Sequence, residues 1–400
     1  MINNIKLKIM KNTIWRYYAF TFLISLHFFA AVLVPFYLQY GGLSKTQMFL
    51  IQSWFLIWIF ILEIPTGVIA DYLGRKTSLV LGAFIVTLAV IIYGAGIPGF
   101  GTFLLAEFLF AVSIALTSGA DDAFLYDSLK ETGREKESKK IFGRSHAFQL
   151  FGFLVAAPIG GVIASTYGLN YPIMFSAVPF FLATLIALTL KEPKYHRGPS
   201  ESRRYWDIAK KGLKFFLQHK TLRLIALDAI IVSASAYYVI WLYQPLLLSL
   251  NVPVAYFGWF HALFLAVEIL VSISFARLEK LFKSSKNYLS FCALITSASF
   301  LLVALFQNVP TIMFFLIFAG GFGLSRIELM IVYMNKLIRS SERATILSSV
   351  SMFRRFTIAL LNPIVGILSD KSLTLALLFV GILPLLVFFF SPVEKSMLED

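Results

Sequence analysis

Cysteine and charged side chains are scarce in this sequence. A single cysteine, Cys292, excludes an internal disulfide and a cysteine-based metal cluster. Only 14% of the 400 residues are charged, whereas 58% are hydrophobic and the mean hydropathy is +0.80. Soluble globular proteins carry roughly 25% charged residues. The composition therefore excludes that class and indicates that lipid is the main solvent of this chain.

Sequence patterns of nucleotide- and metal-dependent chemistry are also missing. There is no Walker loop, no dinucleotide fingerprint after a strand, and no His, Cys and carboxylate group with metal-ligand spacing. We therefore expect no cofactor, no metal and no ATP-driven transport. The formal net charge is +14, but the basic residues do not form one patch, so we expect no nucleic-acid partner. A secondary transporter, a membrane-embedded enzyme acting on lipid, and a channel or receptor stay open at this point.

Long apolar runs dominate the chain. Those long enough to cross a bilayer, about 20 residues each, lie near 15–39, 46–71, 77–97, 101–128, 140–166, 171–190, 221–249, 254–279, 286–307, 309–336, 343–368 and 372–391. The first run follows a polar, basic start and is too long for a signal peptide, so we interpret it as a retained span. The sequence predicts an all-α membrane protein with twelve transmembrane helices.

Basic residues alternate with the spans. One set of connections carries Lys6, Lys8 and Lys11; Arg75 and Lys76; Lys130, Arg134, Lys136, Lys139, Lys140 and Arg144; Lys280, Lys283 and Lys286; and Lys336, Arg339 and Arg343. The opposite connections near 98–100, 167–170, 250–253 and 308 carry no charge, and the first has only Lys45. Because basic loops stay in the cytoplasm, we expect a multi-pass protein of the inner or plasma membrane with both termini cytoplasmic.

The longest polar interval divides the spans into two groups of six. We expect an N-terminal six-helix bundle over 1–190, a linker over 191–220, and a C-terminal six-helix bundle over 221–400. Aromatic and aliphatic residues alternate with lysine and arginine in the linker, which predicts an amphipathic helix on the anionic inner leaflet. A regulatory binding segment is the alternative.

An internal repeat supports this division. The fourth and tenth spans share a pattern, and so do the fifth and eleventh. The matching residues are Ser118, Asp121 and Tyr126 with Ser325, Glu328 and Tyr333, and Pro158 and Gly161 with Pro363 and Gly366. Such repeats are typical of transporters whose halves are related by an axis along the membrane normal, with the substrate site near the midplane.

One polar turn joins the second and third spans. It reads Gly67-Val68-Ile69-Ala70-Asp71-Tyr72-Leu73-Gly74-Arg75-Lys76. Gly67 permits close helix approach, Gly74 supplies a positive φ, and Arg75 and Lys76 are basic as a cytoplasmic loop requires. The spacing Gly-x-x-x-Asp-x-x-Gly-Arg-Lys resembles the loop 2–3 signature of the major facilitator superfamily of secondary transporters. The resemblance implies two six-helix bundles that work by alternating access, and the repeat extends it to the whole chain.

Shorter stretches resemble bacterial drug-exporter-type members of that superfamily. They are Glu63-Ile64-Pro65-Thr66-Gly67, Ser118-Gly119-Ala120-Asp121-Asp122-Ala123, Tyr126-Asp127-Ser128-Leu129 and Arg343-Ala344-Thr345. The fifth span departs from the antiporter pattern, because Ala156-Ala157-Pro158-Ile159-Gly160-Gly161 lacks the Gly before Pro158 and is one residue short. Close helix packing is the other interpretation of these small residues.

Charges at the inner ends of the spans predict a cytoplasmic gate. In relatives that this chain resembles, the Asp of the loop 2–3 signature contacts the other half when the cytoplasmic side is closed. We expect Asp71, Asp127 and Arg343 to form an inter-half latch, with Arg75 nearby. Interfacial solvation of each charge is the alternative.

Carboxylates inside spans are costly, so each is expected to face a cavity or a partner. Asp121 is the first candidate for proton coupling or cation binding, because it has the pseudo-symmetric mate Glu328. Glu107 precedes Asp121 by fourteen residues, which on one helix places both within ~40° of a common face and ~21 Å apart. Glu63 is a further candidate, as is Glu268 in the eighth span. The alternative is that Asp121 or Asp122 caps a neighbouring helix or pairs with a cytoplasmic arginine.

Arginines in the tenth and eleventh spans bear on the substrate's charge. Arg326 and Glu328 are two positions apart and so lie on nearly opposite helix faces. If Arg326 meets the cavity, an anionic substrate group is favoured, whereas Glu328 there favours a cation. Arg354 or Arg355 could neutralise a buried carboxylate.

The first, fourth, seventh and tenth spans line the cavity in transporters of this resemblance. The candidates for substrate contact are Tyr18, His27, Asp122, Tyr237, Trp241, Gln244 and Arg326. Aromatic walls with a few polar groups favour an amphiphilic or cationic ligand, although such rings also fill space between helices. We predict a monomeric, non-enzymatic transporter, with proton-coupled efflux of amphiphilic or cationic small molecules favoured over uptake of a small polar metabolite by a symporter or facilitator.

Overall fold

The computed structural model describes residues 2–193, 214, 216, 218–338 and 343–398. Within these ranges all regular secondary structure is helical. Helices are expected here because a chain in lipid must satisfy its backbone hydrogen bonds within each spanning segment. The described residues contain 11 helical stretches that are long and apolar enough to cross a membrane. The first predicted span is built differently, from α1 (Ile2–Ile24) and short helical pieces between Ala30 and Tyr40, and it completes a twelve-helix fold.

Contacts divide the chain into two units. The first unit contains Met1–Gly42 and Trp54–Ser202, and the second contains Leu43–Ser53 and Arg203–Asp400. The predicted bundles 1–190 and 221–400 assign each helix to one unit only. In the structure, by contrast, α3 (Lys45–Leu73) begins in the second unit and continues into the first. The predicted amphipathic helix of 191–220 lies largely outside the described residues.

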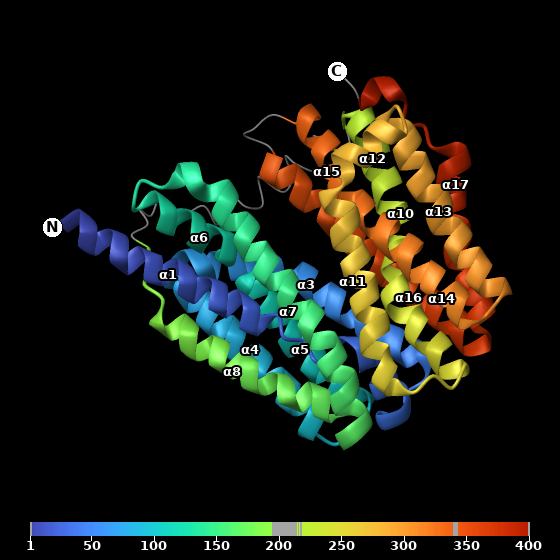
Figure 1. The fold of residues 1–400 in the computed structure, drawn as a ribbon, viewed down its shortest axis with the longest axis horizontal. Helices are drawn as coiled ribbons and strands as arrows, with labels where there is room; N and C mark the ends of the chain where they lie inside the picture. Colours follow the sequence, from blue (N-terminus) through green and yellow to red (C-terminus); the bar gives the residue numbers. More distant parts are fainter. Residues whose placement is uncertain (1, 194–213, 215, 217, 339–342, 399–400) are drawn as a thin grey trace. The chain divides into compact units, whose positions relative to one another are not determined.

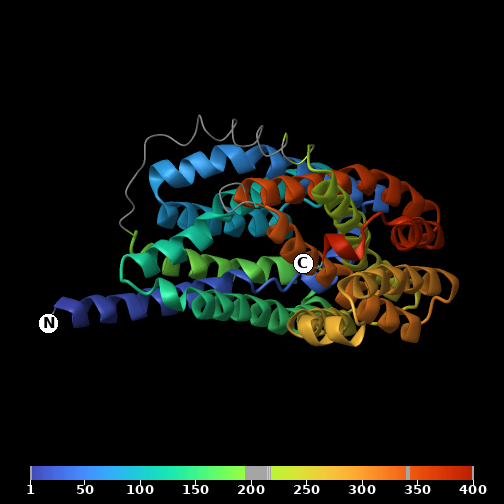
Figure 2. The same ribbon diagram turned by 90° about the horizontal axis from the view of Figure 1, so that it is seen from above.

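The first unit is drawn in blue to green in Figures 1 and 2. Besides α1 and most of α3, its longer helices are α4 (Arg75–Ala95), α5 (Phe100–Thr117), α6 (Ala120–Lys130), α7 (Ser138–Tyr167) and α8 (Tyr171–Thr189). α4 packs against both α5 and α8. Small residues allow this approach: the Ser113 hydroxyl on α5 donates to the Gly82 carbonyl on α4 at 2.8 Å.

The first transmembrane segment is interrupted between residues 25 and 29. α1 ends at Ile24, and helical structure resumes with Ala30–Val32, Leu33–Pro35 and the π-helix Phe36–Tyr40. α7 supports the interruption with glycines: a Cβ at Gly160 would overlap the carbonyl of Phe28, and one at Gly152 would lie 2.9 Å from the carbonyl of Phe22. From α8, the Ser176 hydroxyl accepts the Phe28 amide at 3.2 Å. The amides of Ser25, Leu26 and His27 donate to carbonyls two or three residues earlier, so local turns and a neighbouring helix together satisfy the interrupted backbone.

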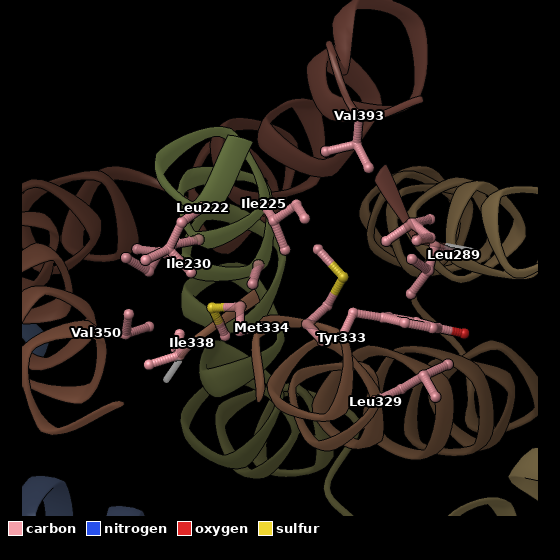
Figure 3. Close-up of a cluster of buried hydrophobic side chains, with 14 of the residues drawn as sticks. Leu222, Ile225, Ile230, Leu289, Leu329, Tyr333, Met334, Ile338, Val350 and Val393 are labelled. Carbon is pink, nitrogen blue, oxygen red and sulfur yellow. The ribbon is translucent and has the colours of Figure 1, made fainter. Parts of the chain in front are cut away.

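The second unit is drawn in yellow-green to red. Its helices are α10 (Lys220–Ser249), α11 (Phe257–Ile273), α12 (Phe275–Leu281), α13 (Ser285–Leu305), α14 (Val309–Phe315), the π-helix η5 (Leu316–Leu324), α15 (Ser325–Leu337), α16 (Arg343–Lys371) and α17 (Leu373–Phe390). α10 is central, since 72% of the residues in its most apolar stretch are buried. Figure 3 shows one core cluster, in which Leu222 and Ile225 of α10 lie near Tyr333 and Met334 of α15.

Large apolar side chains also cover the outer surface of the described helices. Val178 of α8 is 62% exposed and Phe390 of α17 is 76% exposed. A soluble monomer rarely exposes large contiguous apolar patches. These faces fit the hydrocarbon core of a bilayer, as the hydropathy of the sequence predicts.

Candidate functional site

The fourth span is broken where its carboxylates lie. α5 ends at Thr117, Gly119 adopts a left-handed conformation with φ +76°, and α6 starts at Ala120. Asp121 and Asp122 therefore occupy the first turn of a new helix, where free backbone amides favour negative charge. The Asp121 carboxylate accepts the backbone amide of Asp122 at 2.8 Å. This bond lies within α6 itself, so the alternative that Asp121 or Asp122 caps a neighbouring helix stays a prediction.

The two carboxylates line a cavity of about 440 Å³ in the first unit. Its walls come from α1, α5, α6 and α7. The lining residues are Tyr17, Phe20, Thr21, Ile24, Thr117, Asp121, Asp122, Phe142, Gly143, Ser145, His146 and Gln149. Asp121 is half-buried, whereas Asp122 and His146 are exposed. The cavity combines negative charge, a titratable imidazole and aromatic rings.

Tyr17 forms a rigid wall of this cavity. Its ring is buried and stacks on Phe124 of α6, with centroids 5.8 Å apart. Its hydroxyl group lies within electrostatic reach of Asp121 and Asp122, and Ser145 and Thr21 line the same cavity. An aromatic face beside carboxylates can bind an organic cation through both charge attraction and cation–π contact.

His146 and Gln149 are cavity residues that the sequence reasoning did not select. His146 Nδ1 and Gln149 Oε1 lie 3.2 Å apart on α7, and His146 also interacts electrostatically with Asp122. Their spacing of three residues places both on one helix face. That spacing was the available signal, but it does not reveal which face meets the cavity.

Glu107 lies in a different environment from Asp121. It is buried on α5, where it accepts a hydrogen bond from the Tyr37 hydroxyl at 2.8 Å, and Tyr37 and Tyr93 hydroxyls lie 2.7 Å apart. The expected common face of Glu107 and Asp121 assumed one continuous helix. That assumption is wrong, because the break at Gly119 interrupts the helical phase between them.

In the second unit, Arg326 and Glu328 differ in burial, as expected for residues on nearly opposite faces of a helix. Arg326 is 3% exposed and forms an ion pair with Asp228 of α10, whereas Glu328 is exposed. Glu328 interacts electrostatically with Glu268 of α11 and with Arg354 of α16. The cationic member of the pair is therefore neutralised inside the unit, and the carboxylate is the accessible one.

The polar turn of the first unit is held by two carboxylates. Arg75 forms an ion pair with Asp127 and donates to the Ala123 carbonyl at 2.6 Å. Glu192 accepts the backbone amides of Arg75 and Lys76, each at 2.8 Å, and so caps α4. Gly74 has φ +99°, and a Cβ there would lie 2.9 Å from the Glu192 carboxylate. The Glu192 side chain could shift, but the positive φ would strain any other residue, so the backbone favours glycine here.

The predicted latch is only partly described. Asp127 has Arg75 as its ion-pair partner, and Arg343 donates to the Asn335 carbonyl at 3.3 Å. The side chain of Asp71 and the surroundings of Gly67 lie outside the described residues. The latch of Asp71, Asp127 and Arg343 stays a prediction.

The other predicted substrate contacts are not among the residues that line the Asp121 cavity. Tyr18 is buried and donates to the Ile141 carbonyl at 3.3 Å, and His27 is surrounded by the rings of Phe29, Phe153 and Phe180. In α10, Trp241 and Gln244 are buried while Tyr237 is half-buried. Glu63 is half-buried on α3. Their roles in binding or coupling stay predictions.

A comparison with protein families decides the class. The model of the Major Facilitator Superfamily matches residues 18–247, more than half of the chain. This chain belongs to the major facilitator superfamily. The predictions of the family and of the twelve-helix fold are confirmed, and the relatives and solved structures that this chain resembles are described as transporters.

Curated relatives of this superfamily member are distant. An uncharacterized MFS-type transporter of Methanocaldococcus jannaschii is 24% identical over 257 residues, which cover 62% of this chain and 64% of that protein. Multidrug resistance protein 2 of Bacillus subtilis is 29% identical over 160 residues, 40% of this chain and 38% of that protein. The L-fucose-proton symporter of Escherichia coli is 28% identical over 150 residues, 35% of this chain and 33% of that protein. The chain thus matches less than two thirds of the length of these relatives.

Solved structures resemble the whole chain. A variant of the nucleoside transporter NupG has a TM-score of 0.82 at 12% identity, covering 98% of this chain and 100% of that one. A bacterial homolog of the human lysosomal transporter Spinster, in an inward-facing and unoccupied conformation, has a TM-score of 0.76 at 15% identity, covering 99% and 98%. At these identities the likeness shows the shared fold alone.

Proposed function

We propose that this transporter exports amphiphilic organic cations across the cell membrane in exchange for protons. The observation that carries the proposal is the aromatic cavity at the break of the fourth span, where Asp121 and Asp122 provide negative charge. A carboxylate that binds either a proton or a cation makes the two compete for one site. Competition of this kind couples their movements in opposite directions when the site alternates between the two sides.

Three further observations support a cationic substrate. Arg326 is neutralised by Asp228, so it does not oppose a cation. Glu328, the counterpart of Asp121 in the repeat, is an exposed carboxylate. Tyr17 presents an aromatic wall beside the acidic pair. The partial likeness to a multidrug resistance protein agrees with this class of ligand.

Uptake by proton symport is the second candidate. It is favoured by the partial likeness to the L-fucose-proton symporter and by the polar groups of His146 and Gln149 in the same cavity. In symport the proton and a small polar substrate cross in the same direction, whereas in export by exchange they cross in opposite directions. The direction of proton movement relative to that of the substrate separates the two mechanisms.

The remaining features of the proposal concern the whole chain. We place the protein in the inner or plasma membrane with both termini in the cytoplasm and a single chain as the working unit. The cytoplasmic gate consists of the turn with Gly67, Asp71, Gly74, Arg75 and Lys76. Asp127 and Arg343 complete this gate.

The test uses purified protein in liposomes that contain a pH-sensitive dye and carry an imposed pH gradient, acidic inside. Addition of tetraphenylphosphonium or ethidium should collapse the gradient through proton exit in the wild type. Asp121→Asn should slow this proton exit at least about tenfold, since the amide cannot exchange a proton. Glu137→Gln, at a partly exposed carboxylate outside the cavity, is the matched control and should behave as wild type. Cation uptake without proton movement would refute the coupling, and proton entry with a polar solute would establish symport instead.

A further inference from the structure

A cavity distinct from that of Asp121 lies within the second unit, between α10, α16 and α17. Its volume is about 430 Å³, and all of its lining residues belong to that unit. The three helices that form it contact one another. Its walls are mainly apolar, with Ile231 and Ala234 from α10, Leu361 from α16, and Leu383 and Leu386 from α17. We call this cavity the α10–α17 groove.

The groove opens on the outer surface of these helices. Leu227 and Leu386 line it and are 47% and 48% exposed, and Phe390, the last residue of α17, is 76% exposed. Along α10 the groove extends from Leu224 to Ala234, which is ~15 Å at the rise of an α-helix. One leaflet contributes about 15 Å to the hydrocarbon core of a bilayer. The groove therefore matches one lipid acyl chain in length and in polarity.

The polar side chains of the groove wall already have partners. Asp228 forms an ion pair with Arg326 and accepts the Ser391 hydroxyl at 2.6 Å. The Thr357 hydroxyl donates to the carbonyl of Phe353 at 2.8 Å. The wall therefore does not need a polar ligand. Its carboxylate is neutralised by the arginine, so it does not repel an anion that binds nearby.

Lys220, the first residue of α10, lies in line with the groove. Leu224, Leu227 and Ile231 of α10 line the groove. They follow Lys220 by four, seven and eleven residues, and at ~100° per residue this places them within ~40° of its direction around the helix. The Lys220 side chain is exposed. A lysine at the end of a spanning helix extends its ammonium group into the headgroup region, where an anionic phosphate complements it.

We propose that the α10–α17 groove binds one anionic phospholipid from the leaflet that surrounds the start of α10. An acyl chain occupies the groove, and the ammonium group of Lys220 binds the phosphate. The apolar wall provides affinity, because it buries methylene groups of the chain. The lysine provides the preference for an anionic headgroup. This site shares no residue with the Asp121 cavity, so the inference does not depend on the proposed export.

The test is native mass spectrometry of the purified full chain, with phosphatidylglycerol and phosphatidylcholine of identical acyl chains added in equal amounts. The wild type should retain one phosphatidylglycerol with about fivefold preference, the effect of one lysine at an anionic headgroup. Lys220→Gln should abolish this preference, and Lys220→Arg should keep it. Lys280→Gln, which removes the same charge at an exposed position outside the groove, is the matched control.

A second pair of variants tests the apolar wall. Leu227→Trp fills part of the groove and should lower the retention of both phospholipids about tenfold, as expected when about two methylene groups lose their contacts. Leu185→Trp on α8, where the leucine is 44% exposed outside the groove, is the matched control. Both substitutions are at exposed apolar positions, and the melting temperature in the same detergent checks that each variant is folded.

An unchanged preference in Lys220→Gln, or an equal loss in Lys280→Gln, would overturn the assignment of the headgroup. Unchanged retention in Leu227→Trp would overturn the assignment of the acyl chain. Soluble glycerophosphoglycerol at the same concentration should not displace the lipid, and displacement would identify a phosphate site that needs no chain. Displacement by tetraphenylphosphonium would identify a cation site and would equally overturn the phospholipid as the occupant.

Discussion

At the scale of single residues, the ion pair of Asp228 and Arg326 is the most deeply buried charge interaction among the described residues. Both side chains are 3–4% exposed. The pair is supported on both sides: the Ser391 hydroxyl donates to Asp228 at 2.6 Å, and Arg326 Nε donates to the Leu289 carbonyl at 3.2 Å. Desolvation makes such a pair a weak source of stability, but loss of one partner leaves an uncompensated charge.

We therefore expect a strongly non-additive response to substitution. Arg326→Met or Asp228→Leu alone should each lower the free energy of unfolding by about 3–5 kcal/mol, and the double variant should recover most of that loss. The measurement is thermal unfolding in detergent, detected through the reaction of Cys292 with a fluorogenic maleimide. Arg134→Gln breaks a partly exposed pair with Glu137 and should change the melting temperature little. Additive losses would contradict this account.

The role of a residue could be predicted where it depends on residues that are adjacent in the sequence. Gly74, Arg75 and Lys76 form a turn whose φ and charge follow from adjacent residues. Glu192, which caps α4 from far along the chain, could not be found this way, because no periodicity links it to the turn. The partners of Glu107 and Asp228 come from distant helices for the same reason.

At the scale of elements, the interrupted helices are the main feature that hydropathy did not predict. Apolar runs indicate where spans lie, and that prediction holds along the chain. An interruption such as residues 25–29 leaves the run apolar, so the pattern is unchanged. The causes are glycines and hydroxyls on neighbouring helices, such as Gly160 and Ser176, which satisfy or accommodate the freed backbone.

Replacement of Gly160 on α7 by even the smallest side chain should therefore destabilise the protein. A methyl group there would overlap the carbonyl oxygen of Phe28, and backbone cannot move aside cheaply. We expect Gly160→Ala to lower the free energy of unfolding by about 1–3 kcal/mol. Gly143→Ala, on the same helix with open space around its Cβ, should be neutral or stabilise by up to about 1 kcal/mol. The melting temperatures of both purified variants are compared in the same detergent. Equal melting temperatures would refute the close contact between Gly160 and the interrupted segment.

At the scale of the whole molecule, the two units repeat an irregularity as well as a sequence pattern. Asp121 follows a break between α5 and α6, and Glu328 follows the π-helix η5. In both cases the carboxylate lies in the first turn of the next helix. The repeat of Asp121 and Glu328 was visible in the sequence, whereas the irregular backbone before each was not. Helix irregularities inside membranes often mark functional positions.

Orientation in the membrane is the property of the whole chain that the charge pattern predicts most directly. Connections at one end of the helices carry clustered lysine and arginine, and those at the other end are almost uncharged. Basic loops are retained in the cytoplasm. Cysteines introduced in a Cys292→Ser background at Ile97 and Tyr256, which are 85% and 57% exposed, should react with an impermeant maleimide in intact cells. Cysteines at Lys136 and Lys280, both exposed in basic connections, should react only after the membrane is permeabilised. The reverse pattern would invert the orientation and place both termini outside the cytoplasm.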